Sequence, residues 1–439
     1  MTKLQDANYR VDPCTQTVTS RFLLAGTGSA SPTHNAHMPT RAQAALAAKA
    51  ALTNHNAALP LLSLPSEILS ALVVHLPLQS LWCLRSACRV LRAATNDRLR
   101  QLRLVWISEA VENRMYFFKK EIYEMSLING EWALLSHMEA ARRRLGCCAM
   151  TDGRVALVGG ESHIETHRTC DAMSFTAGGL HFDALPPLRS KLCALSAANT
   201  AAGILVCGGF WQTQSESESE DEESSLGGWG MHSDCWLLRP GAAAWTKCSP
   251  LPFGSRYQMA SCALPDGRVF VAGGHTSDFG QREHSNTAAI FSPDRLSWEE
   301  VCEMPGRPYS PVACVLPGTP ARVLVVDSIY IRGEHFLYSY DLATDAWTRM
   351  PGLPLSIQSQ PSQPTEWHVW SVYWSQPVVV AGQVLIKGYL STKGQAASEA
   401  AGTAEMRLLL LSTDESRWIR LDGTKCPYRQ LSCSPVVLP

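Results

Sequence analysis

The chain has 439 residues, 46% of them hydrophobic, which is enough for two or more domains with sizeable cores. Its formal net charge of -1 provides no basic field that would hold nucleic acid or an anionic membrane. No apolar run approaches the length of a membrane span, and the first residues lack the apolar core of a signal peptide. We therefore expect a cytoplasmic or nuclear protein, or one found in both places, that binds neither nucleic acid nor membrane.

Three regions follow one another along the chain. Residues 1–58 show no sustained hydrophobic period, contain few acids and are rich in Ala, Ser and Thr, so we interpret them as a disordered leader; the alternative is an organelle transit peptide. Residues 59–108 carry helical patterns. From residue 112 to residue 439, short apolar runs alternate with Gly, Pro, Asn and Asp turns, which is typical of many short strands.

The helical region contains two amphipathic stretches. Ser66-Glu67 opens the first helix, and Pro77 ends it. A second apolar stripe follows, and TNDRLRQLRLVW (95–106) predicts a spacer helix. About 45 residues cannot enclose this much apolar surface by themselves. We expect the surplus to meet a partner.

Residues 59–97 resemble an F-box, whose pattern is an LP-x-E-I-L start, an L-P break and an L-x-x-L-R-x-x-C/S-R finish. The matching residues are Leu64, Pro65, Glu67, Ile68, Leu69, Leu72, Leu76, Pro77, Leu81, Leu84, Arg85, Cys88 and Arg89, with mild departures at Ala87 and Leu91. The resemblance implies a three-helix module that docks on a Skp-family adaptor and through it on a cullin. The adaptor-binding residues would be Leu64, Pro65, Ile68, Leu69, Leu72, Leu76, Pro77, Leu81, Trp82 and Leu84. The alternative is a helical cap packed on the domain that follows.

An internal repeat organises the rest of the chain. RRRLGCCAMTDGRVALVGG, from Arg142, aligns without a gap with RYQMASCALPDGRVFVAGG, from Arg256. RSKLCALSAANTAAGILVCGG, from Arg189, is a third copy with a two-residue insertion. The first two copies predict a strand, an Asp-Gly turn of type I′, a second strand and a Gly-Gly stop. A variable loop and a second hairpin follow, and that hairpin ends in an aromatic residue.

Six such aromatic ends are present: Trp132, Phe182, Trp245, Trp298, Trp347 and Trp418. Four strands per unit of roughly 50 residues indicate radially stacked propeller blades. With the doublets Gly159-Gly160, Gly208-Gly209 and Gly273-Gly274, the repeat resembles the kelch family. We therefore expect a mainly β fold: a kelch-type β-propeller of about six four-stranded blades, preceded by the small three-helix module.

The first unit lacks an opening strand. Residues 114–118, 121–127 and 131–135 supply three strands, while residues 429–439 match the opening of the repeat. We predict that the last strand pairs with the first three, because a ring joined in this way has no free edge.

Arginines recur just before the first strands of the units, at Arg142, Arg189, Arg256, Arg307 and Arg429, and Trp367 stands near the equivalent place in unit six. In a propeller these starts share one end of the central channel, so the arginines would form a partial ring. In a kelch adaptor that captures acidic peptides, arginines at this motif position grip carboxylates. The resemblance implies a protein substrate with an acidic or phosphorylated degron, held by charge-assisted hydrogen bonds. The structural reading, in which the arginines tie neighbouring loops together, stays open.

The remaining motifs have plainer interpretations. The acidic run at 215–225 is a disordered loop insertion that could also screen the arginines. HIETH (163–167) with Cys170 lacks the helix that would align two histidines, and no CxxC pair is present among 15 cysteines, so we expect no metal and no cofactor. Cys148, Cys193, Cys262, Cys314 and Cys433 fall in predicted first strands, where we expect them to be packing residues. WHVWSVYW (367–374) reads as core and channel wall, or as a ligand platform.

No catalytic constellation is present in the sequence. We expect a non-catalytic substrate-recognition subunit of an SCF-type ubiquitin ligase, which positions its substrate near the conjugating enzyme. The alternatives are a kelch interaction scaffold without a ubiquitin role and, more distantly, a metal enzyme of kelch fold.

Overall fold

The computed structural model describes residues 66–87, 89–112, 117–138, 142–162, 165–176, 179–212, 229–276, 283–330, 336–353, 369–392, 404–421 and 433–438. These residues fall into two compact units. The helical unit holds the described residues up to Leu76 together with Ser80–Thr95, and the second unit holds Pro77–Gln79 and the described chain from Asn96 onward.

Among the residues that the structure describes, three helices precede the first strand: α3 (Ser66–Val73), α4 (Leu78–Ala87) and α5 (Arg89–Gln101). Pro77 lies between α3 and α4, as predicted, because proline has no N–H to continue a helix. The predicted spacer helix over 95–106 is too long: α5 ends at Gln101, and a strand begins at Arg103. Leu104, Val105, Trp106 and Ile107 are all buried, as suits a strand with both faces covered.

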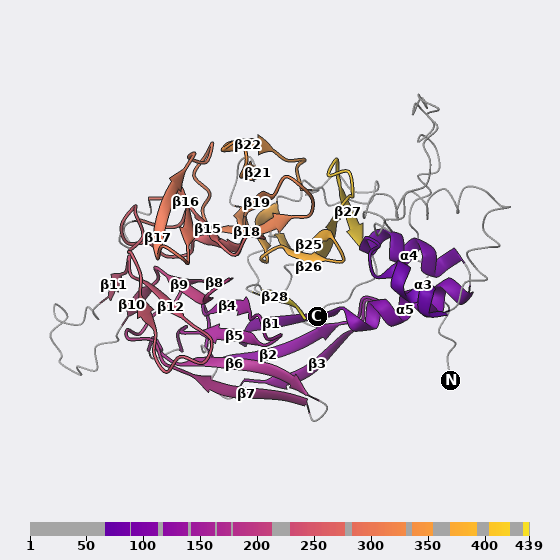
Figure 1. Ribbon diagram of the computed structural model, residues 1–439, viewed down its shortest axis with the longest axis horizontal. Coiled ribbons are helices and arrows are strands. Elements are labelled where there is room, and N and C mark those ends of the chain that lie inside the picture. Colours follow the sequence, from indigo (N-terminus) through magenta and orange to yellow (C-terminus); the bar gives the residue numbers. More distant parts are fainter. Residues whose placement is uncertain are drawn as a thin grey trace, which may run out of the picture. The chain divides into compact units, whose positions relative to one another are not determined.

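The second unit is a ring of six antiparallel blades (Figure 1). Blade one contains β28 (Cys433–Leu438), β1 (Arg103–Glu112), β2 (Phe117–Met125) and β3 (Trp132–His137); blade two contains β4 (Gly146–Ala149), β5 (Val155–Val158), β6 (Cys170–Thr176) and β7 (Gly179–Leu185). Blade three contains β8 (Ser196–Thr200), β9 (Gly203–Cys207), β12 (Cys235–Leu238) and β13 (Thr246–Lys247); blade four contains β14 (Ala260–Ala263), β15 (Val269–Ala272), β16 (Ala288–Ser292) and β17 (Ser297–Val301). Blade five contains β18 (Pro311–Leu316), β19 (Arg322–Asp327), β21 (Leu337–Asp341) and β22 (Ala346–Arg349); blade six contains β24 (Val378–Val380), β25 (Gln383–Thr392), β26 (Ala404–Leu411) and β27 (Trp418–Leu421). This confirms the predicted mainly β propeller.

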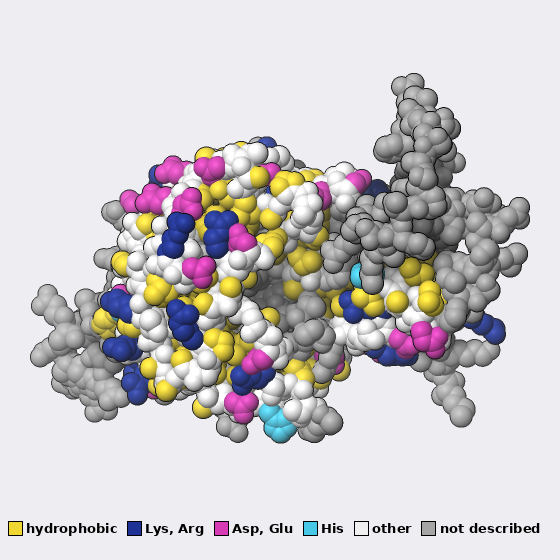
Figure 2. Space-filling model, viewed as in Figure 1, with side chains coloured by type: hydrophobic (Ala, Val, Ile, Leu, Met, Phe, Trp, Pro, Cys, Tyr) yellow, Lys and Arg dark blue, Asp and Glu magenta, His cyan; other side chains and the backbone are white. Residues whose placement is uncertain are grey.

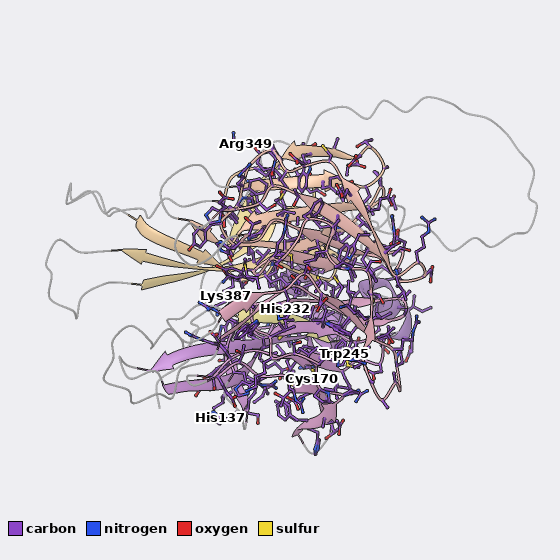
Figure 3. All side chains as sticks on the ribbon, turned by 90° about the vertical axis from the view of Figure 1, so that its left-hand side faces the viewer. His137, Cys170, His232, Trp245, Arg349 and Lys387 are labelled. Carbon is purple, nitrogen blue, oxygen red and sulfur yellow. The ribbon has the colours of Figure 1, made fainter. Side chains whose placement is uncertain are left out.

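Additional strands extend one face of the ring. β10 (Phe210–Gln212) pairs with β11 (Trp229–Met231) beyond blade three, and β20 (Ile329–Tyr330) pairs with β23 (Val369–Trp374), which joins β25. Figure 3 shows strands of blades one and six continuing beyond the body of the propeller on one side. β10, β11 and β20 belong to connections between second and third strands, and β23 belongs to the connection from blade five to the first strand of blade six. Because antiparallel first strands begin on the side where second strands end, we call this side the loop face.

The last strand closes the ring, as predicted. The order in blade one is β28-β1-β2-β3, and Trp106 on β1 lies opposite Pro435 of β28 and Tyr123 of β2. Two of the predicted strands of this blade are wrong, however. Residues 114–118 and 121–127 do not form separate strands, because Phe117–Met125 is one strand and Arg103–Glu112 supplies the other.

The Asp-Gly hairpins use three-residue turns and not the predicted type I′ turn. The Met150 N–H donates to the Arg154 carbonyl at 2.7 Å, and the Gly153 N–H donates to the Met150 carbonyl at 3.2 Å. Gly153 has a φ of 83°, whereas a type I′ turn would require a positive φ at Asp152 as well. The Asp152 carboxylate accepts the Arg154 N–H at 3.1 Å, a local bond that favours the turn found.

The hydrophobic core lies between the blades. Five clusters of buried residues each combine side chains from two neighbouring blades, from the pair of blades one and two to the pair of blades five and six. Blades two to five are therefore covered on both faces by their neighbours, as expected of radial packing.

The predicted aromatic ends lie at the outer strands and link successive blades. The indole N–H groups of Trp245, Trp298, Trp347 and Trp418 donate to the carbonyls of Pro186, Ser249, Cys302 and Pro351, at 2.7, 3.0, 2.9 and 3.0 Å. Each acceptor lies just after the outer strand of the preceding blade. Phe182 has no N–H to donate, so blade two lacks this link to blade one.

Candidate functional site

The helical unit exposes apolar side chains. Ile68, Leu72 and Val74 are 49%, 39% and 40% exposed. Leu69, Leu76, Leu81 and Leu84, also predicted to bind the adaptor, are buried. Among the other predicted residues, Pro77 and Trp82 are half-buried, while Leu64 and Pro65 lie outside the described residues. An exposed apolar surface therefore runs along α3 and includes Val74 just after it, which is not among the predicted adaptor-binding residues.

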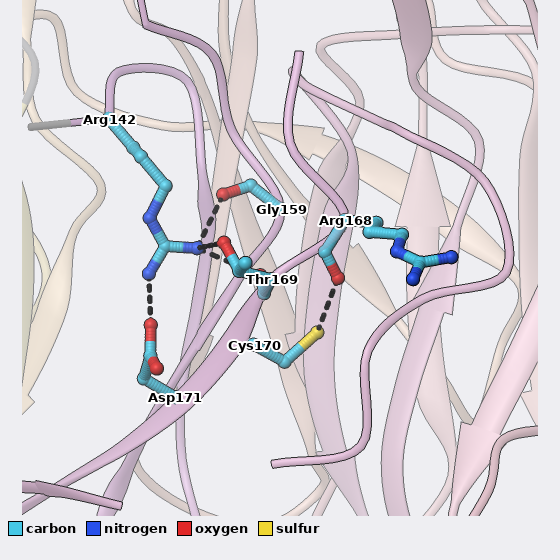
Figure 4. A network of polar contacts seen from close by, with 6 residues as sticks. All are labelled: Arg142, Gly159, Arg168, Thr169, Cys170 and Asp171. Carbon is cyan, nitrogen blue, oxygen red and sulfur yellow. Dashed lines mark hydrogen bonds and ion pairs between the residues drawn. The ribbon is translucent and has the colours of Figure 1, made fainter. Parts of the chain in front are cut away.

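Arg142 is buried within its own blade (Figure 4). Its Nη1 donates to the carbonyls of Gly159 and Thr169 at 3.0 and 2.8 Å and to the Thr169 hydroxyl at 2.8 Å, and its Nη2 pairs with Asp171. The guanidinium thus supplies hydrogen-bond donors for the buried backbone carbonyls at the start of the Gly-Gly doublet.

Arg256 has the same position in blade four. It donates to the Gly273 carbonyl at 3.4 Å, to the Ser285 hydroxyl at 2.7 Å and to Thr287. Burial lowers the pKa of Arg256 to about 10. Both arginines would have to leave these partners to reach a ligand, so the structure corrects their predicted role in substrate binding: they tie strands and loops together.

Arg189 does not occupy the equivalent position in blade three. Arg144 and Gln258 each follow the repeat arginine by two residues and have positive φ values of 51° and 54°, and Ala194 has the matching value of 51°. The equivalent residue is therefore Leu192, whose carbonyl accepts the Gly160 N–H at 2.8 Å, as that of Arg256 accepts the Gly209 N–H at 2.7 Å. Arg189 is exposed beside the Trp236 ring.

The same correction moves Cys193 out of the first strand, because β8 begins at Ser196. Cys148, Cys262 and Cys314 do lie in first strands, and the side chain of Cys433 lies outside the described part of the chain. Burial raises the pKa of Cys148 and of Cys262 to about 12, which fits packing residues.

Arg307 is exposed and does not hold the backbone as Arg142 and Arg256 do; in this blade, Asp327 binds the backbone in its place. The Asp327 carboxylate accepts the N–H groups of Tyr309 and Ser310 at 2.8 and 3.0 Å, in the unit that lacks Gly-Gly. Arg429 and Trp367 lie outside the described residues. The predicted ring of five arginines is therefore not formed by those the structure describes.

A different set of side chains gathers at the loop face. Residues directly after each Gly-Gly bridge to residues directly after each arginine position: Glu161 to Arg143, Phe210 to Cys193 and His275 to Tyr257. We define the loop-face cluster as Arg143, Arg144, Glu161, Cys193, Phe210, Tyr257, His275, His284 and Tyr309. The sequence reasoning missed these residues, although their fixed distance from the Gly-Gly doublets was a usable signal.

One end of the loop-face cluster, the basic end, combines two arginines with a buried carboxylate. The Glu161 carboxylate is buried, 2.6 Å from Arg143 Nε and 3.3 Å from Arg144 Nη1, and it accepts the Cys193 thiol at 3.2 Å. The arginine side chains are 35% and 37% exposed. Two guanidinium groups thus contact the same buried carboxylate. Burial and the neighbouring carboxylate raise the pKa of Cys193, so its thiol stays protonated.

The other end of the loop-face cluster is aromatic. Arg144 lies 5.7 Å from the Phe210 ring, which contacts Tyr257 edge-on at 5.1 Å between centroids. Tyr257 stacks on His275 at 4.8 Å, and His284 lies 4.8 Å from both His275 and Tyr309. Arginine and aromatic side chains held by buried neighbours are the residue types that dominate protein interfaces.

Other surfaces of the molecule are less distinctive. On the face shown in Figure 2, basic and acidic side chains of the propeller are interspersed. Within the described residues, no group of three or more His, Cys, Asp or Glu side chains could hold a metal ion, and no helix could cross a membrane. His163 lies outside the described residues, and Cys170 is buried with its thiol donating to the Arg168 carbonyl at 3.6 Å.

No protein-family model matches the chain. The chain is similar to a Kelch-like protein, terF, of Aspergillus terreus, with 28% identity over 126 residues that cover 25% of each protein. The chain therefore spans about a quarter of the length of the curated relative it matches. Together with the six-bladed ring, this similarity supports kelch repeats in the propeller.

Proposed function

We propose that this chain is the non-catalytic substrate-recognition subunit of an SCF-type ubiquitin ligase. The helical unit docks on a Skp-family adaptor and through it on a cullin, and the propeller binds the protein substrate. The observation that carries the proposal is the exposure of Ile68, Leu72 and Val74 within a segment that resembles an F-box. Three large apolar side chains in water are unfavourable unless a partner covers them.

The loop-face cluster is the proposed substrate site. Its half-exposed Arg143 and Arg144 supply the positive charge that the predicted arginine ring cannot supply, and they lie beside aromatic rings. This combination suits a protein segment that carries carboxylates or a phosphate, because guanidinium groups bind such oxygens through paired hydrogen bonds.

Adaptor binding tests the ligase role. Ile68→Glu with Leu72→Glu should abolish co-purification of the full chain with a Skp-family adaptor, because both positions are exposed and a charge there opposes apolar contact. Arg92→Glu, on the exposed surface of α5, is the control and should bind as before. Helicity and melting temperature report whether the double variant still folds. An unchanged complex, or no complex with the unaltered chain, would overturn the proposal.

Substrate capture tests the loop face. Arg144→Gln keeps Arg143 as a partner for Glu161, so the buried carboxylate stays paired while one cation is lost. We expect Arg144→Gln to weaken substrate capture, and we expect added salt to weaken the remaining capture further. Arg144→Lys should restore part of the lost capture. Arg154→Gln, beside an Asp-Gly turn at the other end of the blade, is the matched control. Equal capture by all variants would remove the loop-face cluster from substrate binding.

A second candidate function is a kelch interaction scaffold without a ubiquitin role. The similarity to a Kelch-like protein supports this function as much as the ligase role, because the similarity concerns kelch repeats and not the helical unit. Reconstitution with adaptor, cullin and conjugating enzyme separates the two functions: a captured protein gains ubiquitin only if this chain is a ligase subunit.

A further inference from the structure

Two large hydrophobic side chains are exposed on the described part of the propeller. Leu134, on β3, is 47% exposed, and Phe182, on β7, is 36% exposed. These are the outer strands of blades one and two, and they lie in contact. Phe182 is also the aromatic end that lacks an indole N–H. Where blades three to six link to the preceding blade through tryptophan, blade two presents an apolar ring to water.

The backbone of β7 is an open strand edge. β7 is the last strand in its sheet, and its seven residues make it the longest outer strand that the structure describes; β3 has six, β17 five, β22 and β27 four each, and β13 two. Residues 181–184 are all exposed. A long, exposed edge with apolar side chains is a template for pairing with another strand.

Charge protects four of the other outer strands from such pairing. β17 carries Glu299 and Glu300, and β13, β22 and β27 carry Lys247, Arg349 and Arg420. β3, which lies in contact with β7, has no Asp, Glu, Lys or Arg. β7 has Asp183 as its one charged residue apart from the titratable His181. Proteins commonly place charges on strand edges to prevent unwanted pairing, so the weak protection of β7 indicates that pairing is tolerated or used here.

The sequence of β7 is complementary to itself. In GLHFDAL (179–185), an antiparallel pairing centred on Phe182 sets His181 opposite Asp183 of the second strand and Leu180 opposite Ala184. Each contact occurs twice, as a two-fold axis requires. Directly opposite apolar pairs and imidazole–carboxylate pairs stabilise antiparallel strands, so this register has favourable contacts at Phe182, between Leu180 and Ala184 and between His181 and Asp183.

We infer that β7 is a self-association surface: two copies of this chain pair through their β7 edges about a two-fold axis at Phe182. The symmetry of the segment favours a second copy over an unrelated protein, because a foreign strand would have no reason to match this register. One strand and the neighbouring Leu134 form a small interface, so the dimer is weak and reversible.

Sedimentation velocity of the full chain, from low to high micromolar concentration, tests this inference. We expect a reversible monomer–dimer equilibrium. Phe182→Asp should weaken it by at least roughly tenfold, because it removes an apolar pair and adds two facing charges. Glu300→Gln, on the outer strand of blade four, should leave it unchanged. A monomer at every concentration, or a dimer that Phe182→Asp does not affect, would overturn the inference.

Two further variants test the register. His181→Lys should tighten the dimer by pairing with Asp183 of the second copy, whereas His181→Asp should weaken it. Phe182→Cys should form a disulfide with its own copy, because directly opposite residues have Cα atoms about 4.5–5.5 Å apart. Ala184→Cys should not, because its two copies would lie about 14 Å apart along the strands. Peptide mapping distinguishes these cross-links from those of the exposed Cys83 and Cys302, and efficient cross-linking at 184 would refute the register.

Discussion

The Lys387 ammonium, on β25, lies 5.2 Å from the centre of the Trp106 ring on β1, so a buried cation of blade six meets a buried ring of blade one. The Trp132 ring of β3 lies 5.3 Å from the same ammonium. Lys387 is labelled in Figure 3. The cation lies between the two blades that complete the ring, where it holds two tryptophans of blade one.

We expect Lys387→Met to lower the free energy of unfolding by about 1–2 kcal/mol, since a desolvated cation over aromatic rings contributes about 2 kcal/mol. Denaturant unfolding measures the change. Lys247→Met is the matched control: its ammonium lies 5.5 Å from the Trp236 ring, but the side chain is 59% exposed, so its loss should cost less than about 1 kcal/mol. Equal effects of the two substitutions would contradict a special role for Lys387.

The closing strand β28 gives a second prediction. Deleting Cys433–Leu438 leaves the edge of β1 without its partner, and that strand contains the fully buried Trp106. We expect the truncated protein to be insoluble or to unfold at a much lower temperature, because an apolar edge is exposed to other chains. Deleting the acidic run at 215–225 is the control and should leave the melting temperature nearly unchanged. A soluble truncation with normal melting would show that the ring does not depend on this strand.

The tryptophan links give a third prediction. Trp298→Phe keeps an aromatic ring but removes the N–H that donates to the Ser249 carbonyl, so stability should fall by about 1 kcal/mol. Phe182→Leu, in the blade that has no such link, should cost less, because the ring is 36% exposed. Thermal and denaturant unfolding measure both variants. A loss from Phe182→Leu that matches or exceeds that from Trp298→Phe would contradict the proposed role of the indole.

Cysteine reactivity gives a fourth prediction. Cys83 and Cys302 are exposed, whereas Cys262 is buried and its pKa is raised to about 12. Alkylation of the native protein near pH 8 should label the exposed pair and spare Cys262, because the thiolate is the reacting species. Raising the pH should not bring Cys262 into reaction until the fold opens or the pH nears 12. Peptide mass spectrometry reads the labels, and early modification of Cys262 would contradict its packing role.

Much of the fold could be predicted from local signals. The Gly-Gly doublets mark where second strands end and the aromatic residues mark the outer strands, while the matching start of the repeat near residue 429 predicted how the ring closes. The strands of blade one could not be placed in the same way. Residues 104–107 of β1 are buried on both faces, so this part of the strand lacks the alternation that identifies a strand by itself.

The binding residues were harder to predict than the fold. Arg142 and Arg256 recur in the sequence because each satisfies backbone carbonyls and hydroxyls at the same place in its blade, and repetition does not reveal whether a side chain points inward or outward. The third copy has a turn that is one residue shorter, because Thr200 pairs directly with Gly203. Leu192 therefore takes the place of the repeat arginine, and Arg189 was matched to that place because it is the nearest preceding arginine.

Because neighbouring blades share their core clusters, the blades should unfold together and not one by one. A blade excised from the ring would expose the apolar side chains that it now packs against both neighbours, so no fragment smaller than the whole wheel should be stable. A substitution that disrupts the packing between any two neighbouring blades should then lower the amount of folded protein in the cell, instead of removing one binding specificity alone.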